Sequence, residues 1–205
     1  MHSSIQKYCI ELTKEFNAIS PERKKLLQQI SDYIITKRKG NRPVNLIYIC
    51  THNSRRSHFG QVWAKVASEY YNIKEVNTFS GGTEATAFNS NAINALKRIG
   101  FAIKPINIEK NTHYHVIYDD QQKPIESFSK VYDDPANPQK EFAAIMTCGE
   151  AEENCPFIPG VELRIGTTYD DPKAFDNTPQ QDAKYNERCR QIALETLYVF
   201  SKVKI

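Results

Sequence analysis

The sequence predicts an α/β fold, with a mostly parallel sheet covered by helices on both faces and a helical N-terminal extension. Short runs of branched apolar residues alternate along the chain with segments whose apolar residues recur every three or four positions. Strands that alternate with helices favour parallel pairing, because parallel strands need a long crossover connection. A length of 205 residues with 40% hydrophobic residues is sufficient for a sizeable core.

Residues 1–40 are predicted to form two helices. Apolar residues recur at helical spacing over 5–16 and again over 26–34. Ser20 followed by Pro21 is typical of a helix start, and Pro43 marks a boundary. We therefore expect a helical N-terminal extension at 1–40 and an α/β domain at 41–205. The basic run within residues 37–42 is expected to be a solvated linker.

The remaining segments fit the α/β pattern except for one insert. Buried strands are expected at 44–49, 76–79, 142–146 and 161–165, and helices at 59–70, 91–98 and 181–200. The polar stretch 104–139 contains an alternating pattern and an Asp-Asp turn, which indicate a hairpin inserted into the domain.

Composition and charge exclude several classes of function. A net charge of +3, without a long basic stripe, argues against nucleic acid, and no apolar window is long enough to span a membrane. Five cysteines in a chain without an export signal indicate reduced thiols in the cytoplasm. The histidines do not combine with Cys or carboxylates at metal-site spacing, so no metal is predicted. Cys9 and Cys189 fall on apolar helical stripes and are expected in the core.

A polar loop with the sequence Cys-Thr-His-Asn-Ser-Arg-Arg-Ser occupies residues 50–57, between the first strand and a helix. Backbone N–H groups of such a loop and the helix dipole favour binding of a tetrahedral oxyanion. Arg56 is able to grip two oxygens of that anion, and the positive potential favours the thiolate of Cys50. Ser57 is able to donate to that sulfur or to cap the helix. The other residues of the expected oxyanion-binding loop are Thr51, His52, Asn53, Ser54 and Arg55. The alternative is a buried structural cysteine before an ordinary loop.

This loop resembles the active-site loop of low-molecular-weight protein tyrosine phosphatases and of the thioredoxin-coupled arsenate reductases that share their fold. Asn53, Ser54, Arg56 and Ser57 stand where that family has Asn, Ser, Arg and Ser. The segment Ser-Gly-Gly-Thr-Glu at 80–84 is similar to the family's Ser-Ala-Gly-x-Glu. The resemblance covers about two thirds of the chain and leaves out the N-terminal helices and the insert.

The segment Cys-Gly-Glu-Ala-Glu-Glu-Asn-Cys-Pro at 148–156 resembles the redox segment of the arsenate reductases. The resemblance implies that Cys148 attacks Cys50, that Cys155 then attacks Cys148, and that thioredoxin reduces the final disulfide, with no bound cofactor. Two unrelated cysteines, or half of a zinc site, are the alternatives.

The family's general acid is the Asp directly before Pro, downstream of the redox segment. Chain order assigns this role to Asp171 in Tyr-Asp-Asp-Pro at 169–172, with Asp170 supporting the loop. The same tetrapeptide occurs at 132–135, where Asp134 is expected to form a turn.

The sequence departs from the family at several positions. His52 replaces a small residue, and Gln61 stands where some arsenate reductases have a Glu associated with potassium, which puts a potassium site in doubt. Arg55 adds charge at the rim of the loop, or is an ordinary solvated residue. The aromatic residues that follow the acidic pair in eukaryotic-type phosphatases are absent after Pro172, which weakens a phosphotyrosine pocket.

We therefore predict a cysteine-dependent oxyanion enzyme that reduces arsenate to arsenite through Cys50, Cys148 and Cys155. A tyrosine phosphatase that hydrolyses phosphate monoesters of phosphotyrosyl proteins through a phosphocysteine at Cys50 is the alternative. A non-catalytic binder of oxyanions or phosphoproteins is a third hypothesis.

Overall fold

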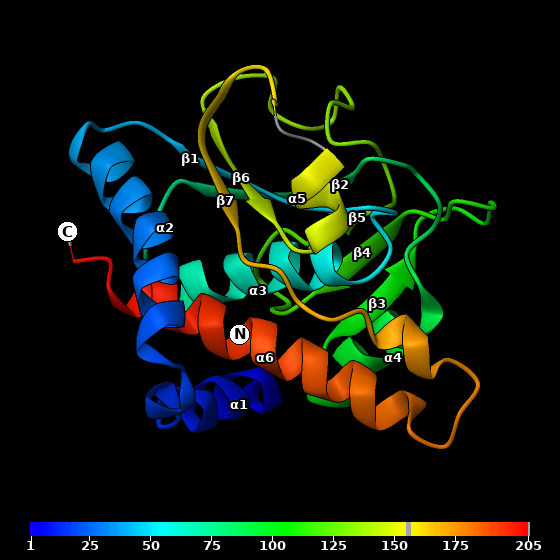
Figure 1. The fold of residues 1–205 in the computed structure, drawn as a ribbon. Helices are drawn as coiled ribbons and strands as arrows, with labels where there is room; N and C mark the ends of the chain where they lie inside the picture. The colour runs from blue at the N-terminus through cyan, green and yellow to red at the C-terminus, as the bar shows by residue number, and fades with distance from the viewer. Residues whose placement is uncertain (155–156, 205) are drawn as a thin grey trace.

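A four-stranded parallel sheet forms the centre of the molecule. The computed structural model describes residues 1–154 and 157–204. The sheet comprises β1 (Val44–Cys50), β2 (Val76–Gly82), β6 (Phe142–Met146) and β7 (Val161–Gly166), in the order β2-β1-β6-β7 (Figure 1). Cys50 pairs with Gly82, and Ile49 pairs with Met146. The carboxyl ends of β1, β2 and β6 therefore meet at one edge.

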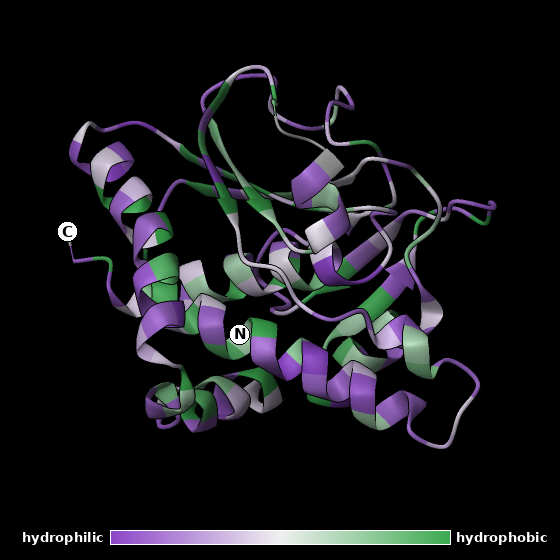
Figure 2. Ribbon diagram, viewed as in Figure 1, coloured by the Kyte–Doolittle hydropathy of each residue, from purple (hydrophilic) through white to green (hydrophobic). Residues whose placement is uncertain are grey.

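Helices cover both faces of this sheet, as predicted, but unequally. The helices are α1 (Ser3–Thr13), α2 (Pro21–Lys39), α3 (Arg56–Tyr70), α4 (Ser90–Ile99), α5 (Gly149–Asn154) and α6 (Gln181–Ser201), with 3-10 helices η1 (Phe16–Ala18) and η2 (Pro172–Phe175). Helix α3 packs against β1 and β2, and α6 packs on α3, whereas the short α5 contacts β1 and β6. Hydrophobic and hydrophilic residues alternate along α2 and α6 (Figure 2). In the described part of the chain, no helix is long and apolar enough to cross a membrane.

The two faces of the sheet bury separate apolar clusters. Leu46 and Tyr48 of β1 belong to a large cluster shared with the helices, whereas Ile47 and Ile49 belong to a smaller one. This division follows from the alternation of side chains along a strand. The smaller cluster also contains the two cysteines at the sheet edge, Cys50 and Cys148.

The N-terminal helices are present where the sequence predicts them. Ser20 caps α2 by accepting the N–H of Arg23 at 3.2 Å. The prediction of a solvated basic linker is wrong for Lys37, which is 1% exposed and lies 2.9 Å from Glu162. Apolar residues of α1 and α2 join the main core, and the proposed division at residue 40 stays a prediction.

The predicted inserted hairpin is present as part of a small antiparallel sheet. Strands β3 (Ala102–Pro105), β4 (Tyr114–Ile117) and β5 (Ile125–Ser127) pair in the order β3-β4-β5. After β5 the chain returns to the end of β2, where Gly82 N donates to Lys130 O and Tyr132 N donates to Gly82 O, both at 2.9 Å. The insert thus reaches the edge at which Cys50 lies.

Candidate active site

The loop after β1 presents unpaired backbone donors beside the buried Cys50. Cys50 is 3% exposed and ends β1, while α3 begins at Arg56. Within the described residues, the backbone N–H groups of residues 53–56 donate to no protein acceptor. These donors and the amino end of a 15-residue helix supply positive potential at one spot. The arrangement is suited to a tetrahedral anion.

The segment after β2 is hydrogen-bonded to the backbone of this loop. Thr83 N donates to Cys50 O at 3.2 Å, and Glu84 N donates to Thr51 O at 2.8 Å. A Cβ atom at Gly82 would lie 2.6 Å from Thr51 O and 2.7 Å from Asn53 N. Only glycine therefore allows this close approach of two backbones.

A chain of hydrogen bonds ends on the sulfur of Cys50. Lys130 N donates to Asn53 Oδ1 at 2.8 Å, and Asn53 Nδ2 donates to Ser57 Oγ at 2.8 Å. Ser57 Oγ lies 3.1 Å from Cys50 Sγ, and its hydroxyl hydrogen is left to donate to the sulfur. Asn53 adopts a left-handed conformation with φ 42°, which Asn tolerates better than most residues. Of the two roles expected for Ser57, the contact with sulfur is the one observed.

His58 supports the same loop as a neutral side chain. It is fully buried, and burial lowers its pKa to about 3, with the Lys130 charge acting in the same direction. Its Nε2 donates to Asn53 O at 2.9 Å, because a carbonyl only accepts. His58 thus holds the backbone of Asn53 without adding charge.

Arg56 is bonded to the segment that carries the predicted acid. Its Nη1 donates to Tyr169 O at 2.7 Å, and its Nη2 donates to Asp171 Oδ2 at 2.6 Å. Asp171 also caps η2 by accepting the N–H of Lys173. Asp134, in contrast, accepts the N–H of Ala136 at 2.8 Å within its own turn. The structure thus brings Asp171 to the loop, and its role as the acid stays a prediction.

Arg55 is not a solvated rim residue, and that interpretation is wrong. The residue is 8% exposed, and its Nε donates to Tyr185 Oη at 2.8 Å. Its Nη2 lies 3.6 Å from Asp176 Oδ2, and Tyr185 donates to Asp176 at 2.7 Å. Arg55 thus ties the loop to α6. Sequence reasoning did not identify Tyr185 as its partner, because the two residues are far apart in the chain.

The other predicted loop residues make bonds that fix the loop. Thr51 donates to Glu150 Oε2 at 2.9 Å, and Ser54 donates to Ala87 O at 2.7 Å. The ring of His52 is partly exposed and lies 3.8 Å from Glu84. The contact of Glu150 with the loop was not predicted, although Glu150 lies in the acidic segment directly after Cys148.

Cys148 lies beside the loop, at the carboxyl end of β6. It is 2% exposed, its Sγ lies 3.4 Å from Thr51 Oγ1, and it accepts the N–H of Ala151 at 3.4 Å. Cys155 lies outside the described residues. Cys9 and Cys189 are fully buried, as expected, and burial raises the pKa of each thiol to about 12.

Gln61 lies where the sequence put a potassium site in doubt. Its Nε2 donates to Thr78 O at 3.3 Å and to Glu126 O at 3.1 Å. Across residues 1–154 and 157–204, no group of three or more His, Cys, Asp or Glu side chains is placed to hold a metal ion.

Comparison with known proteins identifies the family, although no family model matches the chain. An arsenate reductase of Bacillus subtilis is 27% identical over 145 residues, 71% of this chain and 86% of that protein. An arsenate reductase of Brevibacillus brevis is 30% identical over 128 residues, 62% of this chain and 75% of that protein. The chain belongs to the low-molecular-weight phosphatase and arsenate reductase family. It is an enzyme of this kind.

Solved structures of this family share the fold. An arsenate reductase in a phosphate-binding state aligns with a TM-score of 0.53 at 15% identity, over 78% of this chain and 99% of that one. A low-molecular-weight phosphotyrosine phosphatase of Vibrio cholerae aligns with a TM-score of 0.51 at 12% identity, over 77% and 95%. Both branches of the family thus have this fold.

Proposed function

We propose that this enzyme reduces arsenate to arsenite through Cys50, Cys148 and Cys155. The observation that carries the proposal is the position of Cys148. Its sulfur contacts Thr51, the residue after Cys50, and both cysteines lie in one small buried cluster. Ester hydrolysis needs only a nucleophile, an anion-binding loop and an acid, whereas reduction needs a second thiol that reaches the first.

In the first step, the thiolate of Cys50 attacks arsenate held by the loop and Arg56. A sulfur–arsenic bond forms and one arsenic–oxygen bond breaks, and Asp171 protonates the leaving hydroxide. The hydrogen bond from Ser57 at 3.1 Å supports the thiolate before attack. Asp171 already contacts Arg56, so nucleophile, anion site and acid are adjacent.

In the second step, the thiolate of Cys148 attacks the sulfur of Cys50. A disulfide forms, the sulfur–arsenic bond breaks, and its electron pair reduces arsenic from the +5 to the +3 state. Cys155 then attacks Cys148, which frees the Cys50 thiolate and leaves a Cys148–Cys155 disulfide. A dithiol reductant such as thioredoxin reduces this disulfide and is oxidised in turn.

The second candidate function is hydrolysis of phosphate monoesters, in which water resolves a phosphocysteine on Cys50. The observation in favour of hydrolysis is that the loop contains both the nucleophile and the anion-binding groups. Hydrolysis requires neither Cys148 nor Cys155. The relatives that we describe by sequence are arsenate reductases, while a phosphotyrosine phosphatase shares the fold.

Cysteine variants separate the two functions. Cys148→Ser and Cys155→Ser should each stop multiple turnover of arsenate, measured with thioredoxin, thioredoxin reductase and NADPH, but leave aryl phosphate hydrolysis largely intact. Mass spectrometry of the unreduced Cys155→Ser protein should show a Cys50–Cys148 disulfide after one turnover. Wild type given arsenate without reductant should accumulate Cys148–Cys155.

Cys9→Ala is the matched control, because Cys9 is buried away from the loop and should leave both activities unchanged. Wild type that hydrolyses esters well but forms no disulfide with arsenate would assign the protein to the phosphatases. Loss of both activities on replacing Cys148 alone would show a structural role for that residue.

A further inference from the structure

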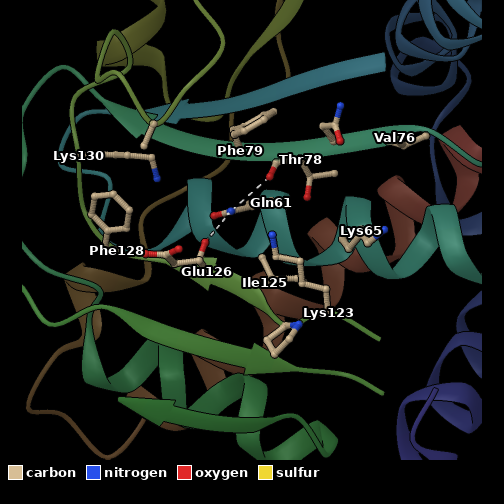
Figure 3. A pocket seen from close by; sticks show the side chains of 13 residues that line it. Gln61, Lys65, Val76, Thr78, Phe79, Lys123, Ile125, Glu126, Phe128 and Lys130 are labelled. Atoms are coloured by element: carbon tan, nitrogen blue, oxygen red, sulfur yellow. Dashed lines mark hydrogen bonds between the residues drawn. The ribbon is translucent and has the colours of Figure 1, made fainter. Parts of the chain in front are cut away.

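A cavity of about 350 Å³ lies between the parallel sheet and the insert. Its walls come from β2, from β5 and the residues on both sides of it, and from α3, and Gln61 of α3 bridges the two strands (Figure 3). None of the residues 50–57 lines it, so it is separate from the oxyanion loop. About half of its lining residues belong to the insert, and the function proposed above uses none of their side chains.

A buried lysine lines this cavity without an anionic partner. Lys130 is 4% exposed, and its Nζ makes no hydrogen bond or ion pair within residues 1–154 and 157–204. It lies 4.2 Å from the centre of the Phe128 ring. Burial lowers its pKa to about 8, although the Asp134 and Glu126 charges act in the opposite direction. A buried cation in this state is stabilised by any anion that reaches it.

An unsatisfied acceptor lines the same cavity. Gln61 is 3% exposed, and its Nε2 is fully used by the carbonyls of Thr78 and Glu126. Its Oε1 is buried and accepts no hydrogen bond in the described part of the chain. Buried polar atoms are nearly always paired, so this oxygen indicates a place for an O–H or N–H group.

The remaining wall is apolar and aromatic at its centre and basic at one end, and it also contains Glu126, whose carboxylate lies 3.1 Å from His113 Nδ1. Ile125 and the rings of Phe79 and Phe128 line the cavity, and so do Lys65 and Lys123. Lys65 is paired with Glu69 at 2.7 Å, whereas Lys123 is exposed. Figure 3 shows Lys65 and Lys123 on one side of Gln61 and Lys130 on the other. Pockets of this kind, apolar with a few convergent polar groups, are typical of small-molecule sites.

We propose that this cavity binds a small organic anion. A carboxylate or phosphate group pairs with Lys130, an O–H or N–H group donates to Gln61 Oε1, and an aromatic or short aliphatic body packs against Phe128 and Ile125. The occupant is a small molecule because the two unpaired groups belong to buried side chains, beyond the backbone hydrogen bonds that an added peptide strand would use.

Such a ligand is connected to the oxyanion loop through the backbone N–H of Lys130. Lys130 N donates to Asn53, which donates to Ser57, which contacts Cys50. A ligand that holds Lys130 in place therefore also holds its N–H, which makes the first of the hydrogen bonds that lead to Cys50. Its occupancy should change the rate at which iodoacetamide alkylates Cys50.

The binding test uses 3- and 4-hydroxyphenylacetate, which carry a carboxylate, a ring and a donor. Titrations of the full chain followed by ¹H–¹⁵N NMR should give a Kd of about 1 mM or tighter and shift amides near Thr78 and Glu126. Lys130→Met should weaken binding by about tenfold or more, since it removes a charge-assisted bond. Lys140→Met, at an exposed lysine elsewhere, should leave the Kd unchanged.

Two analogues test the separate contacts. 4-Hydroxyphenylacetamide lacks the charge and phenylacetate lacks the donor, and each should bind at least several-fold more weakly. No binding of either acid below about 10 mM overturns the proposal. Binding that survives Lys130→Met but is displaced by inorganic phosphate places the probe in the oxyanion loop and also overturns it. These outcomes do not depend on whether the enzyme reduces arsenate.

Discussion

Replacing Lys130 by Met should stabilise the ligand-free protein. Burial lowers the pKa of Lys130 from 10.5 to about 8, which corresponds to about 3 kcal/mol of penalty on the charged form. Loss of the contact with the Phe128 ring offsets about 1 kcal/mol of this. The expected net gain at pH 7 is about 2 kcal/mol, or about 4–8 °C in Tm for a chain of this length.

The stability advantage of Lys130→Met over wild type should decrease as the pH rises. Below pH 8 the lysine is charged in both the folded and the unfolded chain, so the penalty is fully present. Between about pH 8 and 10.5 the folded chain releases the proton first, and the stability of wild type rises relative to the variant. Above pH 10.5 the advantage of the variant should be gone.

Urea unfolding of wild type, Lys130→Met and the control Lys140→Met at pH 7, 9 and about 10.5 measures this difference directly. Other titrating groups cancel, because all three proteins share them. A variant that is less stable than wild type at pH 7, or a difference that does not change with pH, would refute the reasoning that Lys130 is a buried charge without an anionic partner.

Three further predictions concern the oxyanion loop. Arg56→Lys should lower kcat/KM for arsenate or an aryl phosphate by about 100-fold or more, because a point charge cannot replace a planar bidentate grip. Asp171→Asn should slow leaving-group departure by about 100-fold and flatten the pH–rate profile, while Asp134→Asn, in the second Tyr-Asp-Asp-Pro, should be nearly silent; the reverse would assign the acid to the insert. Gly82→Ala should cost about 1–3 kcal/mol of stability in urea unfolding and lower activity, because the new Cβ would lie 2.6 Å from Thr51 O; an unchanged protein would show that the loop tolerates displacement.

The fold was predictable because each strand and helix had a local signal. Strand β1 is a run of branched residues, and α4 ends at Gly100, which has φ 117° and so suits the left-handed end of a helix. The parallel order followed from alternation of strands with helices. Strand β3 of the small sheet, which begins before the expected insert, was not predicted, since it follows directly after a helix end and has only four residues.

The residues that we propose to react were predictable from a short motif, but the residues that support them were not. Cys50 and Arg56 lie within one loop, so their spacing in sequence is also their spacing in space. Arg55 reaches Tyr185, and Lys37 reaches Glu162, across 130 and 125 positions. Only tertiary packing brings these pairs together, and a basic residue on a loop or helix end looks the same in sequence whether it is solvated or buried.

The insert is part of the machinery that shapes the loop. Ser129 donates to His52 O at 3.0 Å, and Lys130 N donates to Asn53 Oδ1 at 2.8 Å. Without Lys130 N the buried amide oxygen of Asn53 would lack a partner, and the left-handed Asn53 would lose a bond that holds it, whereas His52 O would keep the bond from Thr86 Oγ1 at 3.0 Å. Lys130, whose backbone N–H donates to Asn53, has its side chain at the cavity between β2 and β5. A ligand paired with that side chain therefore acts on the same peptide that orients the nucleophile, so the insert joins a binding site to the geometry of Cys50.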